Sequence, residues 1–219
     1  MARPSYVDIV LEELLNEFDR GEIKPGERIN AAHISARLGI SRGPVREALA
    51  ILSGRGLIRL EKDRGATLCP MSPDDVIQIW QVFDPTVGLG VRLAGENIGQ
   101  KGAAERVRDA MSEIYKCART ERTFRFYLVL NDFHFVLNDI SGNPYITDML
   151  EKMNVGYWNR YLAGLIDVSA TADQYIENYR RITDSVLAGD GVAAQAAWSF
   201  HVRWSIAKIR ETVKARATA

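Results

Sequence analysis

The sequence predicts a mainly α-helical protein of two domains: an N-terminal winged helix-turn-helix over residues 1–70 and a C-terminal all-α bundle of about six helices over residues 71–219. A turn glycine followed by a capped amphipathic helix at 38–52 predicts the first domain, together with two short extended segments around Gly65. After Ser72 only helical periodicity is visible, which predicts the bundle. With 219 residues, of which 47% are hydrophobic, each domain can form its own core.

The helix-turn-helix is predicted from residues 30–52. A short helix is expected over 30–38, and Gly39 follows it where a sharp turn needs a residue that tolerates positive φ. Ser41 is a natural N-cap for the next helix. Apolar side chains then recur at helical spacing, at Val45, Ala48, Leu49 and Leu52. We therefore expect a helix that packs this stripe inward and exposes its opposite face.

The exposed face of that helix is predicted to contact DNA. Arg42 and Arg46 lie four residues apart near the helix start, and a helix in the major groove contacts bases with its N-terminal residues. Residues 57–69 are expected to form a β-hairpin wing that turns at Gly65. The candidate DNA-binding residues are Arg37, Ser41, Arg42, Gly43, Pro44, Arg46, Arg64 and Gly65.

Charge is unevenly distributed along the chain. The whole protein has 28 basic and 28 acidic residues, but residues 28–64 hold eight basic and three acidic ones. A basic surface on one domain is typical of duplex DNA binding. A solvated charged face would give the same count, so the charge supports the motif and does not replace it.

The C-terminal bundle is predicted from helical spacing and from breaks rich in glycine and polar residues. Ser72, Pro73 and Asp75 favour a helix start, which places the domain boundary near residue 70. Gly88 and Gly90 fall inside the first helix and indicate close helix packing. The helices are expected over 73–99, 102–120, 122–141, 144–166, 170–188 and 190–216.

The order of these motifs resembles the GntR family of bacterial transcription regulators. The segments P-G-E-R-I-N, L-G-I-S-R-G-P-V-R-E-A-L, G-L-I and R-G-A-T-L carry the resemblance over residues 7–70. F-H at 133–134, S-G-N-P at 141–144, and A-G-D at 188–190 followed by His201 resemble the FCD-type, VanR-like ligand-sensing domain of the FadR-like branch. The resemblance implies a repressor that binds a palindromic operator as a homodimer and responds to a small organic acid or a related metabolite, with a carboxylate as the expected effector.

The same resemblance implies a ligand site in the bundle, with a departure. Many relatives bind a divalent metal through one aspartate and three histidines; here His134 and His201 match, whereas Leu130 and Tyr179 stand at the other two places. With this incomplete set, His134 and His201 are candidate ligands for Zn²⁺ or Ni²⁺, but we expect no tightly held metal. A polar cavity that holds a carboxylate without metal is expected instead, and simple core hydrogen bonding of the histidines is the alternative. The candidate effector-binding residues are Asn131, His134, Asn138, Tyr179 and His201.

Several function classes lack support in the sequence. No apolar run approaches a membrane span, and the two lone cysteines, Cys69 and Cys117, are typical of a cytoplasmic protein. No nucleophile elbow or phosphate-binding glycine loop is present, so no enzyme is expected. The alternative function is a small-molecule or metal-binding bundle with a vestigial DNA-binding head.

Overall fold

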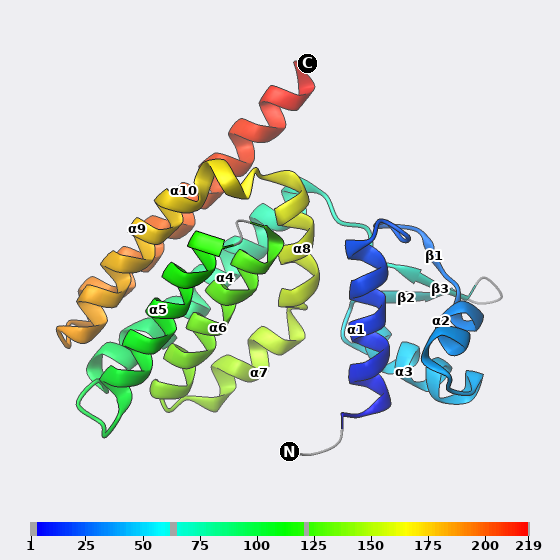
Figure 1. Ribbon diagram of the computed structural model, residues 1–219, viewed down its shortest axis with the longest axis horizontal. Coiled ribbons are helices and arrows are strands. Elements are labelled where there is room, and N and C mark those ends of the chain that lie inside the picture. Colours follow the sequence, from blue (N-terminus) through cyan, green and yellow to red (C-terminus); the bar gives the residue numbers. More distant parts are fainter. Residues whose placement is uncertain (1–3, 62–64, 121–122, 219) are drawn as a thin grey trace. The chain divides into compact units, whose positions relative to one another are not determined.

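The protein divides into two compact units, which are described separately. The computed structural model describes residues 4–61, 65–120 and 123–218. Unit 1 comprises residues 1–72 and 152–158, and unit 2 comprises residues 73–151 and 159–219 (Figure 1). The described residues form ten helices and three short strands, which confirms the predicted mainly α class. Among them, no helix is both long enough and apolar enough to cross a membrane.

Unit 1 is a three-helix head with a small antiparallel sheet. Its elements are α1 (Tyr6–Asp19), β1 (Arg28–Ile29), α2 (Ala31–Leu38), α3 (Arg42–Gly54), β2 (Ile58–Glu61) and β3 (Gly65–Leu68). The strands lie in the order β1-β3-β2, with β3 antiparallel to both neighbours. The hairpin of β2 and β3 is the predicted wing, whereas β1 was not predicted because two residues are too few for a visible alternation.

Local chemistry explains the helix-turn-helix. The Asn30 side chain accepts hydrogen bonds from the backbone N–H groups of Ala32 and His33 and so starts α2. Gly39 ends α2 with φ of 65°, the left-handed conformation expected for this turn. The apolar stripe of α3 is buried as predicted: Val45, Ala48, Leu49 and Leu52.

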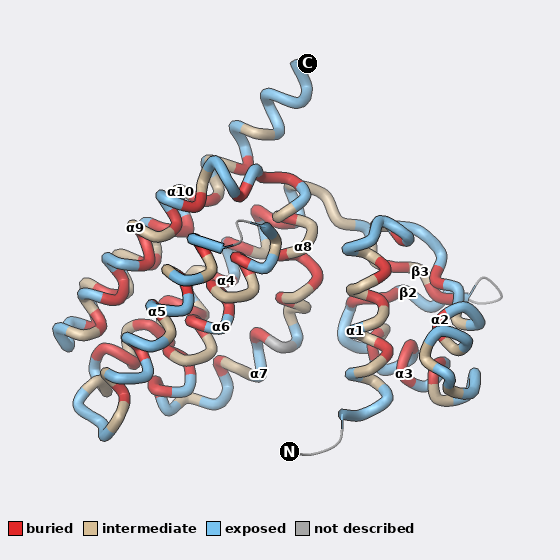
Figure 2. The backbone as a smooth tube through the Cα atoms, in the orientation of Figure 1, coloured by how far each residue is buried: buried red, intermediate tan, exposed pale blue. Residues whose placement is uncertain are grey.

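Unit 2 is a helical bundle in which α4 is central. Its elements are α4 (Pro73–Glu96), α5 (Ala103–Thr120), α6 (Phe124–Ile140), α7 (Pro144–Lys152), α8 (Val155–Leu165), α9 (Val168–Leu187) and α10 (Gly191–Ala217), of which the last residue of α7 and residues 155–158 of α8 fall in unit 1. Helix α4 packs most extensively on α10 and also contacts α6 and α9. Figure 2 shows buried residues recurring along the helices of this bundle, which is the pattern of a shared core.

One boundary differs from the sequence prediction. The single helix expected over 144–166 is two helices, α7 and α8, so the described residues of the bundle and its junction form seven helices where about six were expected. Asn154 lies between them with φ of 53°. Asparagine tolerates the left-handed conformation, so it can end a helix without glycine or proline and leaves no strong break in the sequence.

Glycines allow α4 and α10 to approach closely. A Cβ atom on Gly191 would overlap the backbone carbonyl of Arg92, and one on Gly95 would lie 3.0 Å from the Cα of Gly191. The close packing predicted for Gly88 and Gly90 is confirmed, because their Cβ atoms would meet Trp198 and Asn138. The contact between α4 and α10 therefore requires the absence of side chains at Gly88, Gly95 and Gly191, whereas Gly90 leaves room for Asn138 of α6.

We predict that Gly191→Ala destabilises the bundle by about 1–3 kcal/mol, the usual cost of overpacking, because the Arg92 carbonyl cannot move without distorting α4. Gly164→Ala in α8 is the matched control: a Cβ there meets nothing within 4 Å, so this change should be neutral or slightly stabilising. Urea unfolding of both variants measures the difference, and equal stability would contradict the proposed crossing.

Candidate DNA-binding surface and candidate ligand site

The start of α3 presents unpaired polar groups. Ser41 is the N-cap residue, as predicted, with φ of −70° and ψ of 161°, but its side chain makes no cap hydrogen bond. Arg42 and Arg46 are exposed, and no hydrogen bond or ion pair within the described residues engages either one. Gly43 is exposed and Pro44 is half-buried. This end of α3 can therefore donate to an external acceptor without breaking internal contacts.

An open hollow of about 1050 Å³ lies between α3 and the wing. Arg46 and Gly65 line it, and so does Arg28 of β1, which sequence analysis did not select. The Arg28 Nη2 atom lies 3.4 Å from where a Cβ on Gly65 would stand, so the glycine leaves room for the guanidinium. Arg64, the other wing residue predicted to contact DNA, lies outside the described residues. Strand pairing of β1 with β3 is what brings Arg28 to the wing.

Arg37 occupies a different environment from the one predicted. Its Nη1 atom lies 2.7 Å from Glu22 Oε2 and 3.0 Å from Glu13 Oε1, so its donors are engaged within unit 1. These hydrogen bonds, first from Arg37 and then from Arg20, lower the pKa of Glu22 to about 2. Arg37 thus ties α2 to α1 and to the turn after it, and we do not include it in the proposed DNA-binding set.

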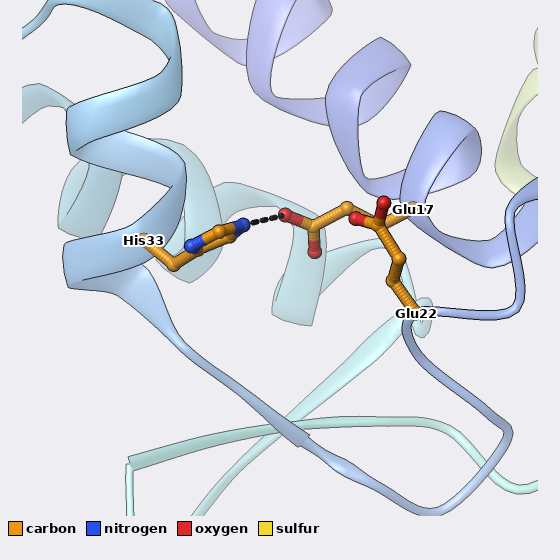
Figure 3. A group of neighbouring side chains, drawn as sticks. All are labelled: Glu17, Glu22 and His33. Atoms are coloured by element: carbon orange, nitrogen blue, oxygen red, sulfur yellow. Dashed lines mark ion pairs between the residues drawn. The ribbon is translucent and has the colours of Figure 1, made fainter.

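The same cluster contains a buried carboxylate. Figure 3 shows His33 pointing toward Glu17, with Glu22 beside it; His33 Nε2 lies 3.8 Å from Glu17 Oε1, too far for a hydrogen bond. Burial raises the pKa of Glu17. Two carboxylates and an imidazole are within metal-binding reach of one another. Because Glu22 is already bound by Arg37 and Arg20, we interpret the group as an ion-pair network.

In unit 2 the two predicted histidines converge with tyrosine and asparagine side chains. His134 of α6 lies 2.7 Å, Nε2 to Oη, from Tyr179 of α9. His201 of α10 lies 3.2 Å, Nδ1 to Nδ2, from Asn178 of α9. The ring centroid of Tyr179 is 5.4 Å from that of His134 and 5.1 Å from that of His201. Three helices thus place these groups in one buried cluster.

The hydrogen-bond partners fix which ring nitrogens donate. Gln174 donates to the Asn178 side-chain oxygen, which leaves the Asn178 amide nitrogen to donate to His201 Nδ1. His201 then carries its proton on Nε2, which has no hydrogen-bond partner among the described residues. Burial raises the pKa of Tyr179 well above its ordinary value, so its hydroxyl keeps its proton. Because His134 Nε2 is the acceptor that lies within hydrogen-bond distance of this hydroxyl, we assign Tyr179 as the donor. In that arrangement His134 Nδ1 carries the ring proton and has no partner in the described part of the chain.

Both histidines are neutral in this environment. Burial lowers the pKa of each to about 3 because the charged imidazolium would be desolvated, and for His134 the neighbouring His201 adds to the effect. Aromatic rings surround them: Trp198 lies 4.8 Å from His134 and Tyr175 lies 5.2 Å from His201, between ring centroids. The cluster is therefore an uncharged polar group inside an aromatic shell.

The donor set does not fit a divalent metal. Within the described residues, no group of three or more histidine, cysteine or acidic side chains close enough to share an ion includes His134 or His201. Leu130, at the place of the expected aspartate, is a buried apolar residue. One nitrogen of each histidine is already hydrogen-bonded, by Tyr179 and by Asn178. Two neutral imidazoles without an anionic ligand make a weak site for Zn²⁺ or Ni²⁺.

The remaining predicted effector-binding residues are both buried on α6. Asn131 is 8% exposed and Asn138 is 1% exposed, and no described residue forms a hydrogen bond with either polar atom of the Asn138 side chain. Asn178 and Thr183 of α9 are also buried polar residues, and they were not predicted from the sequence. Their spacing from the buried Tyr175, Tyr179 and Ile182 could have identified them, since it puts polar groups on an apolar helix face.

Two known protein families match this chain. Residues 7–68, which span unit 1 from α1 to β3, match the family of bacterial regulatory proteins called gntR. Residues 88–203, more than half of the chain, match the FCD domain family.

Two curated proteins and one solved structure are similar to this chain, over lengths that range from about three fifths to nearly all of it. The uncharacterized HTH-type transcriptional regulator YdhC of Bacillus subtilis is 29% identical over 61% of this chain and 60% of its own length. A probable D-xylose utilization operon transcriptional repressor of Paenarthrobacter nicotinovorans is 24% identical over 92% of this chain and 88% of its own. The structure of Escherichia coli McbR/YncC has a TM-score of 0.80 at 22% identity, over 96% of this chain and 100% of that one, and shows the same fold.

We predict that the bundle loses stability as the pH falls from about 6.5 toward 3. In that window the unfolded chain binds protons at His134 and His201 while the folded chain does not, so the free energy of unfolding falls by up to about 1.4 kcal/mol per pH unit for each histidine. Urea unfolding at pH 7 and at pH 5.5, above most carboxylate titration, measures the slope. A flat profile in the wild-type protein would contradict the neutral, buried histidines.

Proposed function

The chain belongs to the GntR family of bacterial regulatory proteins and contains an FCD domain, and we propose on this premise that it is a ligand-responsive repressor that binds a palindromic operator as a homodimer. Its membership makes it a DNA-binding transcription regulator. Two of its relatives carry the name of repressor, which supports repression as the mode of action. The observation that carries the proposal is the unpaired, exposed pair Arg42 and Arg46 at the start of α3.

Two kinds of DNA contact are proposed for unit 1. Arg42 and Arg46 read base edges in the major groove, since a guanidinium can donate two hydrogen bonds to guanine. The Ser41 hydroxyl and the Gly43 backbone N–H donate to phosphate at the helix N-terminus, where the helix dipole favours an anion, and Pro44, which has no N–H to donate, fixes the backbone beside them. The wing at Gly65, joined by Arg28, contacts the DNA backbone or the minor groove.

Sensing is assigned to unit 2. A small molecule that binds at His134, Tyr179 and His201, with Asn131 and Asn138 beside them, changes DNA affinity by favouring one arrangement of the dimer's two heads. The size of the response is limited to the difference in ligand affinity between the two arrangements. No catalytic role is proposed, and a protein whose partner is the bacterial chromosome works in the cytoplasm.

We predict that Arg42→Ala weakens binding to the preferred sequence by about 5- to 150-fold, the value of one good bidentate base contact. The sequence is first obtained by selection from random duplexes with the wild-type protein, and the variants are then compared in gel shifts. Arg55→Ala, at the other end of α3, is the matched control and should bind as the wild type does. Unchanged selectivity in Arg42→Ala would remove α3 as the recognition helix, and a wild-type protein that selects no sequence would favour a vestigial head.

We predict that the protein sediments as a dimer at micromolar concentration, with and without DNA. One recognition helix covers only a few base pairs, whereas two heads related by two-fold symmetry read two half-sites. The Arg42→Ala variant should remain dimeric, because the larger bundle is the proposed dimer platform. A monomer bound to a single half-site would contradict this assembly.

A further inference from the structure

Unpaired hydrogen-bond donors mark the site in unit 2. Within residues 4–61, 65–120 and 123–218, His134 Nδ1, His201 Nε2 and the Asn138 amide nitrogen have no hydrogen-bond partner, and their residues are 4%, 0% and 1% exposed. A buried polar group left unpaired costs about 1–3 kcal/mol, so such groups are normally bonded to water or to a ligand. His134 and Asn138 lie one turn apart on α6, and Trp198 contacts the rings of both His134 and His201, so these donors on α6 and α10 point to a partner that accepts hydrogen bonds.

Charge is missing from the interior of the bundle. The buried polar residues of unit 2, within the described part of the chain, include no arginine, lysine, aspartate or glutamate; they are Asn131, His134, Asn138, Ser141, Asn159, Asn178, Thr183, His201 and Ser205. A carboxylate moved from water into such surroundings loses its hydration and gains no cation in return.

The three arginines within two residues of Tyr179 or His201 do not supply that cation. Arg181 is exposed on α9 and paired with Glu177. Arg180 lies on the exposed side of α9, where it is paired with Glu177 and Asp184. Arg203, two residues after His201, is exposed on α10. An arginine drawn inward would have to give up water or these ion pairs. The surface charges of the two helices therefore leave the buried site neutral.

The aromatic rings beside the two histidines favour a ligand with an apolar or aromatic body. Trp198 lies 4.8 Å from His134 and 5.5 Å from His201, and Phe83 lies 5.8 Å from His134, between ring centroids. Such edge-to-face and tilted rings offer both faces and edges to a planar group.

We propose that this site takes an uncharged small molecule whose carbonyl, hydroxyl or ether oxygens accept hydrogen bonds from His134, His201 and Asn138, and that it discriminates against carboxylates. The inference rests on the proposed sensing role of unit 2 and replaces the organic acid that the family resemblance implies. The Tyr179 hydroxyl, on which a carboxylate was expected to bind, is instead occupied by His134. Neutral donors bind a neutral acceptor without the penalty of burying a charge.

The test compares amides with the carboxylates of the same skeleton. Benzamide and benzoate, nicotinamide and nicotinate, and lactamide and lactate are each titrated into the full-length protein at pH 7.5, with binding followed by ligand-observed NMR. We expect the amide of at least one pair to bind about ten-fold more tightly than its carboxylate, a difference of about 1.4 kcal/mol. Asn138→Leu, which removes two unpaired atoms, should abolish that binding, whereas Asn159→Leu, a buried asparagine on α8, should retain it.

Three results would overturn the inference: carboxylates that bind as tightly as their amides, binding that survives Asn138→Leu, or no binding by any amide at about 10 mM, the weak limit for fragments of this size. These outcomes are separable from failure of the regulator proposal. A protein that selects a DNA sequence yet prefers carboxylates loses only the neutral-ligand inference. A protein that selects no DNA loses the regulator proposal whatever it binds in unit 2.

Discussion

The close approach of α4 and α10 is the constraint on which the bundle depends. Gly95 and Gly191 have no side chain at the crossing, and Gly88 leaves room for Trp198. Because the helices can come this near, the Trp198 indole N–H reaches the Asp84 carbonyl oxygen at 3.0 Å and fixes the register between them. His201, one turn after Trp198 on α10, is then held beside the Tyr179 ring. The arrangement of the ring cluster therefore depends on the backbone contact between α4 and α10.

The two units treat polar groups in opposite ways. In unit 1 the carboxylates of Glu13 and Glu22 and the guanidinium of Arg37 pair near the surface, where water screens them and several contacts share the ordering of each side chain. In unit 2 the buried polar side chains are neutral and are held by aromatic packing. The head can thus offer charges such as Arg42 to a polyanion, whereas the bundle can distinguish small molecules by shape and by hydrogen bonding.

How much could be predicted from the sequence depends on the range of the interaction. The turn at Gly39 and the buried stripe of α3 were predicted because caps, turns and periodicity are local. The pairing of Arg37 with Glu13 and Glu22 was not predicted, because these glutamates precede Arg37 by 24 and 15 positions and meet it only through tertiary contact. His134 and His201 were found only through the family resemblance, and their actual partners depend on how α9 is rotated in the bundle. The end of α7 was missed because Asn154 adopts a left-handed conformation, which asparagine permits but which its presence in a sequence does not predict.

The tryptophans around the buried histidines give the bundle an intrinsic optical property. The Trp198 indole lies edge-on to His134 with 4.8 Å between ring centroids, and Trp80 lies 5.8 Å from His201. Indole emission responds to the polarity and to the protonation of groups in contact with the ring, and a neutral imidazole quenches it less than a charged one. Both rings are almost fully shielded from water, at 0% and 3% exposure. Because these two of the four tryptophans lie against the histidines, we expect a change in hydration or contact at His134 and His201 to alter their contribution to the fluorescence of the protein.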